Sequence, residues 1–108
     1  MLILVSYIKM EFEKLNIRKE LIDALKAQEI TAPTEIQEKS IPLILEKKDV
    51  IGMSRTGSGK TIAFITPMLN NLEHKGHITS LIVVPTRELA VQVSNEIVKL
   101  GKFLKVNV

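Results

Sequence analysis

The sequence predicts an α/β fold in which parallel strands are joined by helices. Three observations indicate this class: a short apolar strand that leads through a glycine-rich loop into a helix at residues 49–61, a second apolar run at residues 80–84, and helical apolar spacing around them. This alternation is typical of a three-layer arrangement, a parallel sheet with helices on its faces. With 108 residues, of which 45% are hydrophobic and 25% charged, the chain has the composition of one small globular domain.

The first half of the chain predicts two helices. Asn16 is expected to cap a helix over residues 17–28, because apolar side chains recur there on one face. Thr34 is expected to open a second helix, since Thr34 and Gln37 stand at the spacing of a capping box. Pro42 is expected to bend this second helix, because its ring removes a backbone donor.

The second half predicts an alternation of helices and strands. Residues 60–72 have the pattern of a helix, with a kink expected near Pro67. Residues 80–84 (SLIVV) are apolar at successive positions, which is typical of a strand covered on both faces. A helix over residues 87–100 and a strand over residues 103–108 (FLKVNV) are expected to follow.

The stretch DVIGMSRTGSGKT carries the chemistry of the chain. Val50 and Ile51 predict a buried strand, and the loop after it leads into a helix. Phosphate-binding loops with the template G-x-x-x-x-G-K-[ST] occur in this strand-to-helix context, and only the first template position departs here, being serine. The alternative is a glycine-rich turn with an incidental lysine. The candidate nucleotide-binding residues of the loop are Ser54, Arg55, Thr56, Gly57, Ser58, Gly59, Lys60 and Thr61.

Each part of this loop has an expected role. Glycines let successive N–H groups from about Gly57 to Thr61 turn inward around phosphate oxygens, and the helix that follows adds the positive end of its dipole. Lys60 can reach the β- and γ-phosphates, and the Thr61 hydroxyl can ligate Mg²⁺. Lys60 and Thr61 are therefore the candidate catalytic residues, limited to contacts with phosphate and metal.

Composition excludes some classes of site and leaves others open. The formal charge of +3 permits a polyanionic partner, although a solvated surface explains it equally well. Without cysteine there is neither a disulfide nor a thiolate metal site, so a reducing, cytoplasmic location is expected. His74 and His77 are expected to be solvated loop residues.

The amino-terminal segment has no pattern of a membrane span. The apolar run at residues 2–5 is too short to cross a membrane, so no membrane partner is expected. Met10 is a possible alternative start.

Three stretches resemble the early motifs of DEAD-box RNA helicases, ATPases of helicase superfamily two with RecA-like domains. ITAPTEIQ at residues 30–37 resembles their Q motif, and Phe12 resembles the aromatic residue upstream of it. SRTGSGKT at residues 54–61 resembles motif I, and PTRELA at residues 85–90 matches motif Ia residue for residue. The three motifs in this order span nearly the whole chain.

The resemblance implies a partial RecA-like P-loop NTPase domain. It divides the chain into an extension without an expected role at residues 1–9, a Q-motif helical region at residues 10–48 and the first half of the ATP-binding domain at residues 49–108. The chain departs from the family in the Q motif, where Glu29 and Ile30 replace the usual glycine and aromatic residue.

The resemblance also implies roles in ATP binding for two residues outside the loop. The amide of Gln37 is implied to pair with adenine, since it can donate and accept hydrogen bonds together, and a capping-box role is an alternative that can coexist. Phe12 is implied to stack on the base. Its alternative is a core position beneath the first helix.

Pro85, Thr86 and Arg87 are implied to contact the sugar-phosphate backbone of RNA. A helix N-terminus with a hydroxyl and a guanidinium suits a phosphate, and Thr86 is also expected to cap its helix. The alternative for Arg87 is an ordinary surface charge.

The expected function is the ATP- and RNA-binding portion of an ATP-dependent RNA helicase. In the family, the Asp-Glu-Ala-Asp motif and arginines of a second domain complete ATP hydrolysis, and this sequence has neither. The chain alone is therefore expected to be truncated, inactive in turnover and prone to aggregation through open sheet edges. The alternatives are a non-catalytic nucleotide- or RNA-binding remnant and another P-loop enzyme such as a small-molecule kinase, which leaves PTRELA unexplained.

Overall fold

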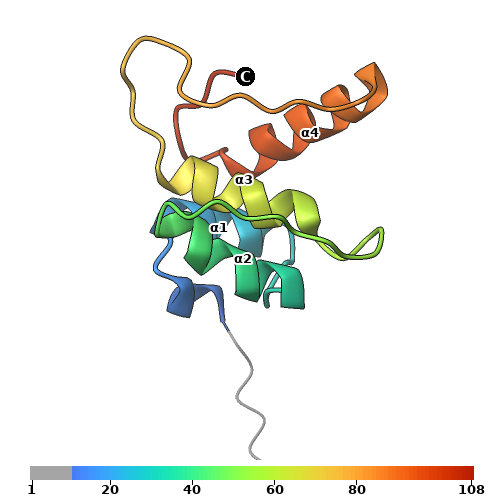
Figure 1. Ribbon diagram of the computed structural model, residues 1–108. Helices are drawn as coiled ribbons and strands as arrows, with labels where there is room; N and C mark the ends of the chain where they lie inside the picture. Colours follow the sequence, from blue (N-terminus) through green and yellow to red (C-terminus); the bar gives the residue numbers. More distant parts are fainter. Residues whose placement is uncertain (1–10) are drawn as a thin grey trace, which may run out of the picture.

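The computed structural model describes residues 11–108, and the regular structure of this part is helical. A short 3-10 helix, η1 (Phe12–Leu15), precedes four α-helices. These are α1 (Lys19–Ala27), α2 (Glu35–Leu45), α3 (Lys60–Asn70) and α4 (Arg87–Leu100). Figure 1 shows α1, α2 and α3 grouped together, with α4 above them. No helix in this part of the chain is both long and apolar enough to span a membrane.

The extension predicted at residues 1–9, with its apolar run at residues 2–5, lies outside the described residues, as does the alternative start at Met10.

The three predicted strands do not form, so the expected parallel sheet is absent from residues 11–108. Residues 50–51, 80–84 and 103–108 have no regular secondary structure, and no backbone hydrogen bond joins any two of these segments. A strand exists only when a neighbouring strand accepts and donates its backbone hydrogen bonds. The predicted sheet is therefore not confirmed, because none of the three segments has a partner strand among the described residues.

Residues 80–84 have the alternating burial of a strand, although they form none. Ile82 and Val84 are partly buried and pack against the core, whereas Leu81 and Val83 are each 84% exposed. Alternate side chains thus point to opposite faces, as they do in a strand. The predicted cover on both faces is therefore wrong for this structure, since the described residues cover one face.

Helix starts are predicted well where a threonine side chain caps the helix. Thr34 precedes α2 and forms the predicted capping box with Gln37. Thr86 precedes α4, and its hydroxyl accepts a hydrogen bond of 3.1 Å from the backbone N–H of Leu89. The predicted range 87–100 of α4 is confirmed, because both the cap and the apolar spacing are local features of the sequence.

The start of α1 was predicted wrongly. The N-cap residue is Arg18, and Asn16 instead ends η1 in the left-handed conformation, with φ of 59°. Asparagine tolerates this conformation better than most residues, which suits it to a turn between two helices as well as to a cap. The third helix also ends earlier than predicted, at Asn70, and both Pro42 and Pro67 lie inside their helices.

One hydrophobic core joins the predicted Q-motif region to the segment after it. Buried side chains from η1, α1 and α2 meet those from α3 and α4, and the most extensive packing joins α2 to α3. The core comprises Phe12, Leu15, Ile17, Leu21, Ala24, Leu25, Ile41, Ile65, Leu69, Val93, Ile97 and Leu100. The packing of α2 on α3 brings the start of α2 to the loop that precedes α3.

Candidate nucleotide-binding site

The loop between residues 54 and 59 folds back on itself just before α3. Gly57 and Gly59 have φ angles of 80° and 88°, a left-handed conformation in which other residues are strained. The backbone N–H of Ser58 donates a hydrogen bond of 3.3 Å to the carbonyl of Arg55. The two glycines therefore allow a tight turn. The turn ends at Gly59, directly before α3.

The amino-terminal end of α3 carries no side-chain cap. Its N-cap residue is Gly59, which has no side chain, so no capping side chain accepts a hydrogen bond from the first-turn N–H groups of the helix. At the start of α4, by contrast, the Thr86 hydroxyl satisfies one such donor. Free first-turn donors and the positive end of the helix dipole favour an anion at this position. The end of the loop is therefore suited to a phosphate group.

Lys60 connects the two ends of the loop. Its ammonium group donates a hydrogen bond of 2.5 Å to the backbone carbonyl of Ser54, the first residue of the template. The hydroxyl groups of Ser54 and Ser58 also form a hydrogen bond with each other. Lys60 and both serines are partly buried.

The side chain of Gln37 reaches the same loop from α2. Its Nε2 donates a hydrogen bond of 3.0 Å to the carbonyl of Gly59, and its Oε1 accepts one of 2.9 Å from the backbone N–H of Thr34. Gln37 is only 2% exposed. The structure thus confirms the capping-box role of this residue and also places its amide against the phosphate loop.

Thr34 and Gln37 leave no room for a larger residue at Gly59. A Cβ atom added to Gly59 would clash with Nε2 of Gln37 and lie 3.0 Å from the hydroxyl oxygen of Thr34. At Gly57, which has a similar backbone conformation, an added Cβ would meet nothing within 4 Å. The sequence predicted Thr34 only as a helix cap. Its contact with the loop at Gly59 follows from the packing of α2 on α3.

Phe12 lies apart from this arrangement, in the hydrophobic core. Its side chain is 2% exposed and belongs to the same buried cluster as Leu15 and Ile41. This is the core position that was the alternative interpretation of Phe12. Stacking on a base would require the ring to leave the core, and the stacking role stays a prediction.

The remaining predicted residues are more accessible. Arg55 and Thr56 are exposed at the turn of the loop, and Thr61 is partly buried in the first turn of α3. Pro85 and Arg87 are exposed on either side of the capping residue of α4. Figure 1 shows α3 and α4 both starting on the right of the view, so the phosphate loop and the start of α4 lie toward the same end of the helix group.

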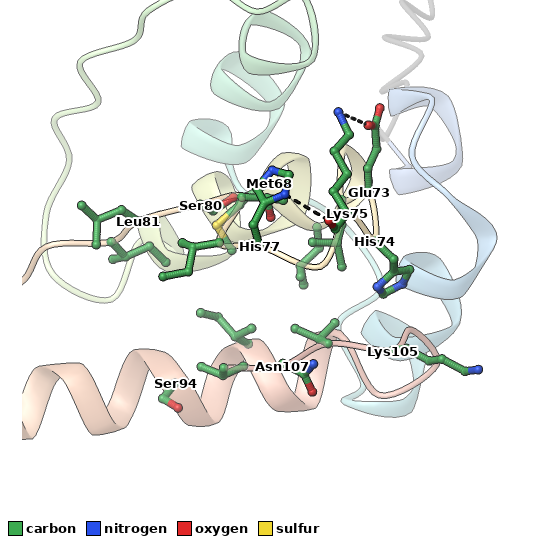
Figure 2. A pocket seen from close by; sticks show the side chains of 18 of the residues that line it. Met68, Glu73, His74, Lys75, His77, Ser80, Leu81, Ser94, Lys105 and Asn107 are labelled. Atoms are coloured by element: carbon green, nitrogen blue, oxygen red, sulfur yellow. Dashed lines mark hydrogen bonds and ion pairs between the residues drawn. The ribbon is translucent and has the colours of Figure 1, made fainter.

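A cavity of the described part lies elsewhere. It has a volume of about 750 Å³ and is bounded by the end of α3, α4, the segment around residues 73–84 and the carboxyl-terminal residues 105–108. Figure 2 shows His74, Lys75 and His77 at this cavity, where His77 Nδ1 and the carbonyl of Lys75 are 3.1 Å apart. None of the predicted site residues lines this cavity, and its walls are mainly apolar.

Comparison with known proteins adds to this geometry. The family model for DEAD/DEAH box helicases matches residues 34–108. The DEAD-box ATP-dependent RNA helicase RhpA of Helicobacter pylori (strain ATCC 700392 / 26695) is 44% identical over 97 residues, covering 90% of this chain and 20% of the relative. The ATP-dependent RNA helicase CshA of Limosilactobacillus reuteri is 44% identical over 94 residues, covering 86% of this chain and 19% of the relative.

Solved structures share the same arrangement. A DEAD box protein from the hyperthermophile Methanococcus jannaschii matches with a TM-score of 0.80 and 39% identity, over 84% of this chain and 25% of that one. Dbp5 of S. cerevisiae bound to RNA and ADP BeF3 matches with a TM-score of 0.83 and 33% identity, over 89% of this chain and 25% of that one. The chain thus spans about a fifth to a quarter of the length of these proteins.

Proposed function

Because this chain belongs to the DEAD/DEAH box helicase family, we propose that it is the ATP- and RNA-binding portion of an ATP-dependent RNA helicase. The observation that carries the proposal is the hydrogen bond between Gln37 and the Gly59 carbonyl, which joins the Q motif to the phosphate loop. In this proposal residues 10–48 are the Q-motif region and residues 49–108 the first half of a RecA-like ATP-binding domain.

The triphosphate of ATP would lie at the loop. Residues 54–61 contribute backbone N–H groups, and the start of α3 has the free donors and dipole that favour an anion. Lys60 would exchange its hydrogen bond with the Ser54 carbonyl for contacts with the β- and γ-phosphates. The ammonium is a mobile point charge with three donors, so this change needs only a rotation of the side chain.

The adenine base would be recognised by Gln37. Each end of its amide already makes one hydrogen bond within the protein, but the oxygen can accept a second bond and the nitrogen can donate a second. The internal bonds hold the amide in one orientation. Its side chain is only 2% exposed, so, like the ring of Phe12, it would have to become accessible before a base could pair with it. Phe12 would support the base only if its ring left the core.

Mg²⁺ would be held partly by the Thr61 hydroxyl in the first turn of α3. A hydroxyl oxygen is a ligand type that this hard cation accepts, and the ion keeps several waters in phosphate sites. When bound, Mg²⁺ neutralises charge on the β- and γ-phosphates. Thr61 would contribute one ligand and would orient the phosphate end of the nucleotide.

The RNA backbone would contact the exposed start of α4. Thr86 uses its oxygen as an acceptor for the helix, and its O–H remains available to donate to a phosphate. Arg87 is exposed beside it and adds a planar charged donor. Such contacts position a strand without reading its bases, so binding to residues 85–87 is expected to be independent of sequence.

A binding measurement tests the ATP site. Titration of a fluorescent ATP analogue with Mg²⁺ is expected to show saturable binding that is weakened at least about tenfold in Lys60→Ala, since a charge-assisted contact is lost. Lys99→Ala, a change of an exposed lysine in the last turn of α4, is the matched control and should bind as the wild type does. Equal binding by all three proteins, or none by the wild type, would contradict the proposal.

The salt dependence of RNA affinity tests the second site. Arg87→Ala is expected to reduce the slope of log affinity against log salt by about one, because one phosphate contact is removed. Lys19→Ala, at the start of α1, is the control for a lost surface charge. Identical slopes for both variants would argue against a contact at Arg87.

Turnover tests the expected inactivity of this chain. Steady-state phosphate release by the 108-residue protein, with and without RNA, is expected to stay near the background rate. Robust turnover that disappears in Lys60→Ala would overturn this expectation.

A further inference from the structure

The cavity between α4 and the end of α3 (Figure 2) is separate from the phosphate loop, which precedes the start of α3. Its volume of about 750 Å³ lies within the range of about 300–1,000 Å³ that is usual for small-molecule sites. Ile78 and Leu81 line the cavity and are 85% and 84% exposed, so it opens to solvent on their side. A small molecule therefore has both room and a way in.

The walls of the cavity are mainly apolar and come from segments that are distant in the sequence. Leu69 from α3, and Val93 and Ile97 from α4, are buried in the core. Ile82 and Val106 line the cavity from segments without regular secondary structure, and both pack against that core. Contact with such walls removes the apolar surface of a ligand from water, which favours binding.

The charged side chains that line the cavity leave a net positive charge. They are Glu73, Lys75 and Lys105, and Glu73 forms an ion pair of 2.6 Å with Lys75. Lys75, and then Lys47, hold the pKa of the Glu73 carboxyl below its ordinary value of 4.5, so this carboxylate is charged and already paired at neutral pH. Lys105 is exposed and has no ion-pair partner among the described residues. An unpaired ammonium group in residues 11–108 thus stands at the edge of an apolar cavity.

We propose that this cavity binds a small amphipathic carboxylate, whose apolar body lies against the walls and whose carboxylate pairs with Lys105. The walls bind the hydrophobic part, and the charge selects an anion over a cation of the same size. A lysine suits the edge of such a site, because its aliphatic stem packs on apolar surface while its ammonium group stays in water. Figure 2 shows His74 and Lys105 toward the same end of the cavity, and an imidazole carries at least one N–H donor in either tautomer.

Isothermal titration calorimetry with decanoate at neutral pH tests this proposal. Decanoate is expected to bind saturably to the wild type. Decyltrimethylammonium, which has an apolar chain of the same length and the opposite charge, is expected to bind at least about fivefold more weakly, because the ammonium of Lys105 repels it. Equal binding of the two compounds, or no binding of decanoate, would overturn the proposal.

Lys105→Gln separates the effect of the charge from that of the walls. The variant is expected to bind decanoate about twofold to fivefold more weakly than the wild type, since one partly solvated ion pair is lost. Lys99→Gln, at an exposed lysine that does not line the cavity, is the matched control and should bind as the wild type does. Lys105 is exposed, so its substitution leaves the core intact. Equal affinities of the two variants would argue against a carboxylate at Lys105.

A pair of phenylalanine variants tests the place of binding. Ser80 lines the cavity, whereas Val83 is 84% exposed and does not line it. Ser80→Phe is expected to fill the cavity and abolish saturable binding, and Val83→Phe, with the same ring outside, should bind as the wild type does. Unaltered binding by Ser80→Phe would place the ligand elsewhere. Self-association that Ser80→Phe abolishes, in a protein that binds no decanoate, would identify a second copy of the chain as the occupant and would also overturn the proposal.

Discussion

The side chain of Gln37 donates a hydrogen bond of 3.0 Å to the backbone carbonyl of Gly59, across 22 positions of the sequence. Its other amide atom accepts a bond from Thr34 N–H at 2.9 Å. A buried amide with both ends satisfied is stable where it lies, and an unsatisfied one would be costly. This residue therefore fixes the distance between the start of α2 and the end of the phosphate loop.

Gln37→Ala should destabilise the protein as well as weaken nucleotide binding. The change leaves the Thr34 N–H and the Gly59 carbonyl without this partner, which is expected to lower the free energy of unfolding by about 1–3 kcal/mol. Gln92→Ala, at an exposed glutamine of α4, should change it by less than about 0.5 kcal/mol. Urea unfolding measures both, and equal stability of the two variants would show that the amide bridge contributes little.

Gly59→Ala should be the most damaging glycine substitution in the loop. Gly57, Gly59 and Gly76 all have positive φ, so alanine at each carries a similar backbone strain of about 1–2 kcal/mol. Only at Gly59 does the added Cβ also clash with Gln37 and crowd Thr34. Urea unfolding of the three alanine variants should rank Gly59→Ala clearly below the other two. Equal losses at all three positions would mean that backbone strain alone decides.

Glu29→Gly should stabilise the protein. Glu29 has φ of 60°, and the bonds Glu29 N–H to Lys26 carbonyl and Ile30 N–H to Leu25 carbonyl form the helix end in which glycine is preferred. Relief of the strain, less the entropy cost of glycine, is expected to add up to about 1 kcal/mol to the free energy of unfolding. Glu29→Ala keeps the Cβ atom and should add nothing. If alanine stabilised as much as glycine, the carboxylate and not the backbone would be responsible.

Leu81 and Ile82 should respond differently to the same substitution. Leu81 is 84% exposed, so Leu81→Ser is expected to leave the unfolding free energy within about 0.5 kcal/mol and to reduce aggregation measured by light scattering. Ile82 packs against the core, so Ile82→Ser should lose about 1–3 kcal/mol. The opposite ranking would show that the outer face of this segment is buried in solution.

The ion pair between Glu13 and Lys26 joins η1 to α1 at 3.0 Å. A backbone hydrogen bond, and then Lys26, hold the pKa of the Glu13 carboxyl below its ordinary value of 4.5. As the pH falls, the Glu13 carboxylate is therefore protonated in the unfolded chain before it is protonated in the folded protein. The small contribution of the ion pair to the free energy of unfolding is thus present above pH 4.5 and lost as the pH falls through the folded pKa. Unfolding of Glu13→Gln should therefore show a weaker acid dependence than unfolding of the wild type.

Local features of the sequence were sufficient to place the starts of α2 and α4. Thr34 and Thr86 cap the helices that they were predicted to cap, since a cap involves only residues three or four positions apart. Asn16 was misplaced because one residue type serves both as a cap and as a left-handed turn. The resemblance to DEAD-box helicases rested on three short motifs and is confirmed by the family match.

By itself the sequence determined the order of the helices, the loop at residues 54–59 and the family, because each depends on residues close together in the chain. Only the tertiary structure decided which apolar segments pair, and in residues 11–108 the three predicted strands lack partners for their backbone groups. It also decided that the ring of Phe12 lies in the core and that the amide of Gln37 meets the carbonyl of Gly59. Both outcomes depend on how η1, α2 and α3 pack, which no local pattern specifies.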